Sequence, residues 1–245
     1  DLERPVQVVH DGVAVPWVDD DWRGLSEEAQ RARWDAWLQE DLARGVDVGV
    51  APLLRLALFR VADSEYLCAW SHHHLVLDGW CLGLILDELF AQYEARRVGR
   101  TRHEHPARPY GEFVAWLRRQ DREALSRYWR ESLAGMEAPT AVPGILPATV
   151  GQPPARPDRI ERCALSDAET HALKATAAAH RVTIGTLVQG AWALVLARRS
   201  GSDDVVFGTT VSGRPPDLPG ADAMLGLFIN TVPVRVSVPE DMTAA

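Results

Sequence analysis

The stretch AWSHHHLVLDGWC, residues 69–81, places three consecutive histidines four residues ahead of an aspartate. Two apolar runs, 52–61 and 66–74, surround a short polar turn and predict a pair of neighbouring strands. From Trp80 to Val98 apolar residues recur at three- and four-residue steps and arginines close the run, which predicts a helix. The histidines are therefore expected where a buried strand turns into a helix, a place that commonly displays functional side chains.

Three interpretations of the histidine run compete. Successive side chains of a strand point to opposite faces, so His72, His73 and His74 cannot all reach one metal ion, and no HExxH motif or cysteine cluster adds zinc ligands. Purely structural histidines would explain the nearby Asp78 and Gly79 poorly. A general base explains more, because imidazole has a pKa of about 6.5 and a turn aspartate can hold the loop in shape.

Composition narrows the class of protein. The chain has 245 residues, 47% of them hydrophobic, which is ample for a globular core. Its net charge of −8 argues against a nucleic-acid partner. Three widely spaced cysteines fit a reducing cytoplasm, and we find neither a signal peptide nor an apolar run that could span a membrane. The chain starts without Met, so we expect a segment of a larger polypeptide.

Periodicity predicts two mixed α/β lobes, each built from strands and helices in two layers. The first lobe, 1–135, should begin with a hairpin over 6–18 turning at Asp11-Gly12. It continues with a helix over 25–44, capped by Ser26 and ended by Gly45, and with helices over 106–120 and 122–135. Residues 136–157 are rich in Pro and Gly and predict a linker. The second lobe, 158–245, should contain strands over 159–166, 203–214 and 227–238 and helices over 167–181, capped by Ser166, and 183–200.

The chain resembles the condensation domains of nonribosomal peptide synthetases, a branch of the chloramphenicol-acetyltransferase-like superfamily. Residues 73–80 match the family signature HHxxxDGW. YGEFVAW, 110–116, is similar to YxDFAxW, with Glu112 in place of Asp. FGTTVSGRP, 207–215, and LGLFINTVPVR, 225–235, resemble two further family stretches, in the expected order.

The resemblance implies chloramphenicol-acetyltransferase-like lobes, one nearly complete and one partial, in a V-shaped pair. It covers the whole chain, but family segments are expected before residue 1 and after residue 245. We therefore expect residues 1–245 alone to be inactive.

The implied reaction is aminolysis. A donor aminoacyl or peptidyl thioester passes to the amino group of an acceptor aminoacyl thioester, and both arrive on the phosphopantetheine of carrier proteins. The implied partners are upstream and downstream carrier proteins and an adjacent adenylation domain of the same polypeptide. No cofactor or metal is expected to bind the domain itself, and neither nucleic acid nor membrane is an expected partner. Antibiotic biosynthesis is the implied setting.

The resemblance also assigns roles. His74 becomes either the base or the group that positions the amine and stabilises the tetrahedral intermediate, while Asp78 and Gly79 shape the catalytic turn. A buried carboxylate needs a charged partner, and Arg214 is our candidate for Asp78. The remaining assignments are structural roles for Arg214, Tyr110 and Trp116, and substrate-binding roles for His73, which should also support the loop, and for Trp80, Ser212 and Asn230.

Within the family, the motifs favour the subtype that joins an L-configured donor to an L-configured acceptor. Heterocyclisation and epimerisation domains carry different residues at the signature. Two alternatives stay open: an acyltransferase that uses acyl-CoA, and a catalytically silent domain that recruits other enzymes to the assembly line.

Overall fold

The computed structural model describes residues 6–102, 108–136, 139–142 and 161–239. The chain divides into two compact units. The first comprises Asp1–Arg119 and Gly213–Ile229, and the second comprises Gln120–Ser212 and Asn230–Ala245. The chain therefore leaves the first unit, builds most of the second, and returns to the first for one segment of the sequence.

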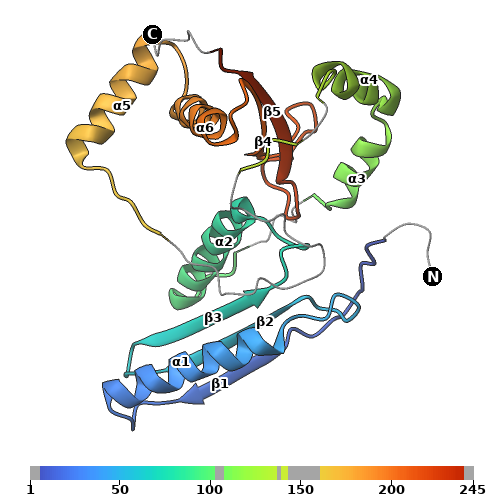
Figure 1. The fold of residues 1–245 in the computed structure, drawn as a ribbon. Helices are drawn as coiled ribbons and strands as arrows, with labels where there is room; N and C mark the ends of the chain where they lie inside the picture. The colour runs from blue at the N-terminus through green and yellow to red at the C-terminus, as the bar shows by residue number, and fades with distance from the viewer. Residues whose placement is uncertain (1–5, 103–107, 137–138, 143–160, 240–245) are drawn as a thin grey trace. The chain divides into compact units, whose positions relative to one another are not determined.

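A three-stranded sheet forms the base of the first unit, in the order β1-β2-β3 (Figure 1). β2 (Leu54–Arg60) and β3 (Tyr66–His72) are antiparallel, as the sequence predicts. β1 (Trp17–Asp21) pairs with β2 in the parallel direction. The predicted hairpin over 6–18 is wrong, because residues 6–16 form no strand and the Asp11-Gly12 pair makes only a bend. Alternation of apolar and polar residues indicates that a segment can form a strand, but it does not identify the strand with which that segment pairs. The partner of β1 is β2, which lies far along the chain.

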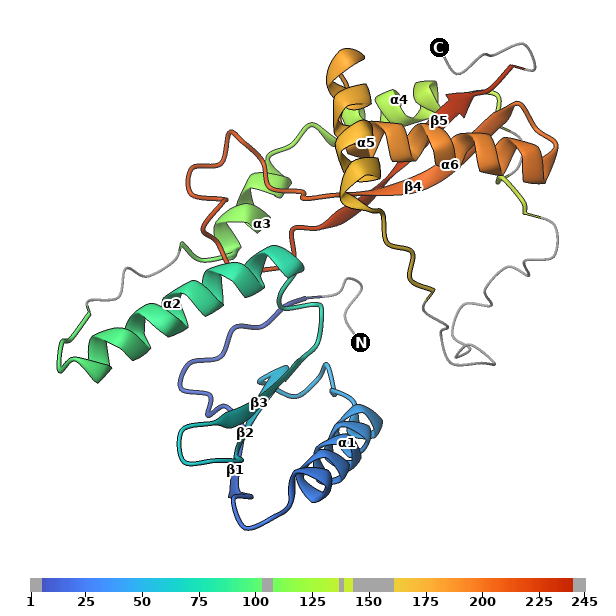
Figure 2. The same ribbon diagram turned by 90° about the vertical axis from the view of Figure 1, so that its left-hand side faces the viewer.

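The helix α1 (Glu27–Arg44) runs alongside one face of this sheet (Figure 2). Ser26 caps it and Gly45, at φ 62°, ends it, which confirms both predictions. Its half-buried Trp34 and Trp37 pack on a buried cluster of sheet and loop residues: Trp22, Ala57, Phe59 and Ala69. Burial of these large aromatic surfaces holds the helix to the sheet.

Two further helices belong to the first unit. α2 (Gly79–Arg97) begins directly after Asp78, whose carboxylate caps it, and ends with two arginines that complement the helix dipole. α3 (Gly111–Arg118) is shorter than the predicted 106–120. It carries Phe113, which faces the returning segment of the chain.

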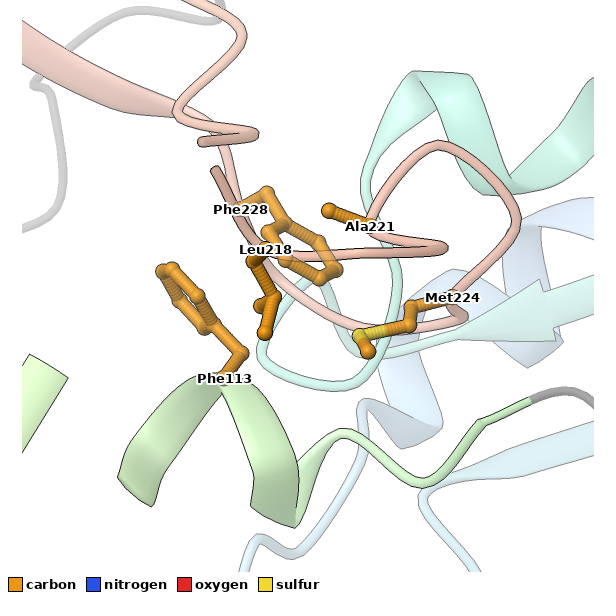
Figure 3. Close-up of a cluster of buried hydrophobic side chains, with 5 residues drawn as sticks. All are labelled: Phe113, Leu218, Ala221, Met224 and Phe228. Atoms are coloured by element: carbon orange, nitrogen blue, oxygen red, sulfur yellow. The ribbon is translucent and has the colours of Figure 1, made fainter. Parts of the chain in front are cut away.

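The returning segment 213–229 forms a second hydrophobic core with α3. Figure 3 shows Phe113 of α3 beside side chains of the loop, and the buried members of this cluster are Phe113, Leu218, Ala221, Met224 and Phe228. Gly213 starts the segment at φ 65°, and a Cβ there would lie 1.7 Å from the carbonyl oxygen of Phe228. Only glycine fits this close approach.

The second unit contains an antiparallel ribbon of β4 (Asp204–Val211) and β5 (Asn230–Ser237). Its helices are α4 (Arg122–Ser132), α5 (Asp167–Ala179) and α6 (Ile184–Ser200). Ser166 and Glu169 form a capping box at the start of α5, which confirms the predicted cap. Ala193, Leu196 and Ala197 of α6 pack on Val205 of β4.

The predicted strand over 159–166 is wrong for its described part, because 161–166 lie in no strand or helix. Most of the predicted linker, 136–157, falls outside the described residues, so the lobe limits at 135 and 158 stay a prediction. No helix in the described parts of the chain is both long and apolar enough to cross a membrane.

Candidate active site

The histidine run lies where β3 ends. His72 is the last residue of the strand, opposite Leu54 of β2. The next amide, that of His73, donates to the carbonyl of Leu53 at 2.9 Å, and the carbonyl of His73 accepts from the amide of Val76 at 3.1 Å. The chain therefore turns at once after the strand, and His74 is exposed in that turn.

The three imidazoles have different environments. His73 is half-buried, and its Nδ1 accepts a hydrogen bond from the amide of Leu75 at 3.1 Å. This bond ties His73 to the loop. His72 is half-buried, with its ring centroid 5.5 Å from that of Trp70. Burial lowers the pKa of His72, and the neighbouring charge of His74 lowers it further.

Asp78 is buried, with 3% of its surface exposed, and both carboxylate oxygens are engaged. Its Oδ1 accepts from the amide of Cys81 at 3.2 Å and so caps α2. Its Oδ2 accepts from the amides of Phe228 at 3.0 Å and Ile229 at 3.3 Å. Burial acts to raise the pKa of Asp78. The backbone hydrogen bonds and the charge of Arg214 outweigh that effect, so the pKa lies below its usual value.

Arg214 is the ion-pair partner predicted for Asp78. Its Nη2 lies 3.5 Å from Oδ1 of Asp78, and 7% of its side chain is exposed. Its Nη1 donates to the carbonyls of Ala221 and Met224. The guanidinium also stacks over the ring of Phe228, 4.1 Å from its centroid. Arg214 thus folds its own segment and joins it to the first turn of α2.

Gly79, Trp80 and Cys81 make up that first turn. Gly79 is the first helical residue, so its amide has no acceptor within the helix, and a Cβ built on it would meet no atom within 4 Å. Trp80 is 56% exposed, and its Nε1 donates to the carbonyl of Asp222 at 2.9 Å.

Cys81 and Tyr110 hold the returning segment at Gly226 and Leu227. The Cys81 sulfur lies 3.2 Å from both the nitrogen and the oxygen of Gly226. The Tyr110 hydroxyl donates to the carbonyl of Leu227 at 2.6 Å. Burial raises the pKa of this tyrosine, and the negative charge of Asp78 adds to the effect. The role of Cys81 was missed from the sequence, although its position on the same helical turn as Asp78 was visible.

Three candidate residues remain: Trp116, Ser212 and Asn230. Trp116 of α3 donates from Nε1 to a carboxylate oxygen of Asp217 at 3.1 Å, within the first unit. Ser212 and Asn230 belong to the second unit. They lie at the same end of the β4–β5 ribbon, because Asn230 is opposite Val211, and both are exposed. Within the described parts of the chain, no group of three or more His, Cys, Asp or Glu could hold a metal ion.

Comparison with known proteins shows the family. The family model for the condensation domain matches residues 1–245. The chain therefore belongs to the condensation domains of nonribosomal peptide synthetases. The chain is 43% identical over 242 residues to chondramide synthase cmdD of Chondromyces crocatus, covering 98% of this chain and 6% of that protein. It is 36% identical over 244 residues to surfactin synthase subunit 2 of Bacillus subtilis, covering 100% of this chain and 7% of that protein.

Solved structures agree on a mixed α/β, chloramphenicol-acetyltransferase-like fold. The first condensation domain of the CDA synthetase superposes with a TM-score of 0.67 at 25% identity, covering 99% of this chain and 53% of that one. The starter condensation domain of rhizomide synthetase, solved in complex with C8-CoA, gives 0.70 at 23% identity, covering 94% and 51%. The chain therefore spans about half the length of these solved chains and a few per cent of its curated relatives.

Proposed function

We propose that this domain forms an amide bond between a donor aminoacyl or peptidyl thioester and an acceptor aminoacyl thioester. Both thioesters are carried on phosphopantetheine arms of carrier proteins. In the bond-forming step the acceptor nitrogen attacks the thioester carbonyl, the carbon–sulfur bond breaks, and the donor carrier leaves as its thiol. The nitrogen loses one proton as the amide forms.

The contrast between Asp78 and His74 carries this proposal. Asp78 is buried, accepts three backbone hydrogen bonds and pairs with Arg214, so its carboxylate stays ionised and holds structure. His74 precedes Asp78 by four residues and is exposed in the turn that follows β3. Of these two signature residues, only His74 is a titratable group that a substrate can reach. We therefore propose that His74 is the residue that acts on the acceptor amine.

Two roles for His74 fit this placement. As a base it would take the proton of the attacking amine, and as a positioning group it would orient the amine and stabilise the tetrahedral intermediate. The amide of Gly79, at the N-terminus of α2, is the proposed donor to the developing oxyanion, because helix N-termini favour negative charge. His73, Trp80, Ser212 and Asn230 are the proposed substrate contacts.

The finer assignment is an L-donor, L-acceptor condensation domain of an antibiotic-producing synthetase, with carrier and adenylation domains in the same polypeptide. The motifs of the sequence favour this subtype. The match occupies only 6% of chondramide synthase cmdD and 7% of surfactin synthase subunit 2, which supports further domains in the same polypeptide. The absence of transfer by residues 1–245 alone stays a prediction.

The test is transfer between loaded carrier domains in the intact synthetase. His74→Ala should lower the single-turnover rate constant by about 10²- to 10⁴-fold, the range of general acid–base catalysis. His171→Ala, an exposed histidine of α5, is the matched control and should leave the rate unchanged. Transfer by His74→Ala at the wild-type rate would remove both proposed roles of His74. Turnover of free acyl-CoA without carriers would instead favour a CoA-dependent acyltransferase.

A further inference from the structure

A second buried aspartate lies on the other side of the histidine run. Asp41 and Asp78 are the buried acidic residues among those the structure describes, 6% and 3% exposed. Asp78 anchors the helix end of the histidine loop. Asp41 belongs to the last turns of α1. This helix packs on the sheet that contains β3, the strand from which the histidine loop departs. A buried carboxylate is costly unless it is fully bonded, so its partners indicate what it stabilises.

One partner of Asp41 is Arg55, on β2. Its Nε donates to Oδ1 of Asp41 at 2.5 Å, and its Nη2 donates to the main-chain carbonyl of the same residue at 2.7 Å. Its Nη1 donates to the carbonyl of Gly45 at 2.7 Å. Arg55 thereby fixes the C-terminal end of α1 to the sheet. The bond from Arg55 is the main reason that the pKa of Asp41 lies below its usual value.

The other partner is Ser71, which immediately precedes the histidines. Its hydroxyl donates to Oδ2 of Asp41 at 2.5 Å. Ser71 is opposite Arg55 in the β2–β3 register, so one carboxylate binds both strands at the same cross-strand pair. The following residues are His72, the last of the strand, and His73, whose amide donates to the carbonyl of Leu53. The network therefore fixes the point from which the histidine loop departs.

We infer that Asp41, acting through Ser71, is a positioning residue for His74. The inference rests on the proposed function, because it concerns how the working histidine is held. Two buried carboxylates then hold the two ends of one loop: Asp41 through the strand and Asp78 through the helix. Productive geometry must hold to within about 0.5 Å, which a loop anchored at one end does not secure.

The test uses Ser71→Ala in the intact synthetase, since this change removes one bond and keeps the Asp41–Arg55 pair. We expect the single-turnover rate constant at saturating carriers to fall about 10- to 100-fold, the loss that a 1 Å misplacement produces. Ser71→Thr keeps the hydroxyl and should restore most of the rate. Ser64→Ala, in the turn at the far end of the same two strands, is the control and should behave as wild type.

Amide hydrogen exchange separates positioning from general support. In Ser71→Ala we expect faster exchange at His73 and Val76, whose amides close the loop, with exchange along α1 unchanged. Wild-type transfer by Ser71→Ala, with His74→Ala inactive, would overturn the inference alone. Wild-type transfer by both variants would overturn the proposed function. Asp41→Asn should show the same loop exchange and a larger loss of rate, and an unchanged rate in a folded Asp41→Asn protein would also overturn the inference.

Discussion

Replacing Asp78 by Asn tests whether its charge holds the returning segment in place. The side chain keeps its shape, but one of its two acceptor oxygens becomes an NH₂ group that can only donate. In the wild type Oδ2 serves the amides of Phe228 and Ile229, and Oδ1 serves Cys81 and Arg214. Either orientation of the amide therefore leaves one of these pairs of donors without an acceptor.

The magnitude follows from these contacts. An unsatisfied buried donor costs about 1–3 kcal/mol, and removing one partner of a buried ion pair costs about 3–5 kcal/mol. These contributions overlap at Arg214, so we expect Asp78→Asn to lower the free energy of unfolding by about 3–5 kcal/mol. A domain has only about 5–15 kcal/mol in total, so the variant should be close to unfolding at 37 °C.

Urea denaturation of the complete condensation domain, followed by tryptophan fluorescence, measures this loss. Asp222→Asn is the matched control, because it makes the same chemical change in the same segment at an exposed side chain. It should change the free energy of unfolding by less than about 0.5 kcal/mol. A loss below about 1 kcal/mol in Asp78→Asn would refute the reasoning, since the carboxylate charge would then not be needed.

Two further predictions concern pH and backbone. The pKa values of Asp41 and Asp78 are both lowered in the folded protein, so their stabilisation is complete above the unfolded pKa of about 3.9 and is lost as pH falls through the lower folded values. The urea midpoint should therefore drop on acidification below about pH 4, and less steeply in Asp78→Asn. Gly213→Ala should prevent stable closure of segment 213–229, because φ is 65° and the new Cβ would lie 1.7 Å from a carbonyl oxygen. Rapid proteolysis within 213–229 would report the failure, whereas wild-type resistance would show that the backbone can adjust.

Features set by local chemistry could be predicted from the sequence. The caps at Ser26, Asp121, Ser166 and Thr183 each accept an amide of the helix that follows, whatever the rest of the chain does. Two of these, Ser26 and Ser166, were predicted as caps. The β2–β3 pair was also predicted, because its strands are neighbours in the sequence.

Features that depend on a partner far along the chain could not be predicted from the sequence. Residues 6–18 alternate as a hairpin should, yet Trp17–Asp21 pairs in parallel with a strand that begins more than thirty residues later. Local alternation contains no information about that partner. Likewise a strand was predicted over 159–166, but 161–166 lie in no strand of the described chain and contain no β-branched or aromatic residue.

Only part of the candidate site could be predicted from the sequence. The need of a buried carboxylate for a charge indicated an arginine for Asp78, and the structure places Arg214 there. Asp41 was missed, although it shares the apolar stripe of α1 with Trp34 and Trp37 at helical spacing. A charged residue on the buried stripe of a helix is a usable signal for such networks.

The separation between Asp78 and its partners also has a consequence for synthesis on the ribosome. The amide of Phe228 is 150 residues beyond the carboxylate that it binds. At about 5–20 residues per second, the chain needs about 8–30 s to supply it. Through that interval Oδ2 of Asp78 lacks its two backbone donors, the amides of Phe228 and Ile229. The turn that carries the histidines therefore cannot gain this anchor until the chain has been made as far as Ile229.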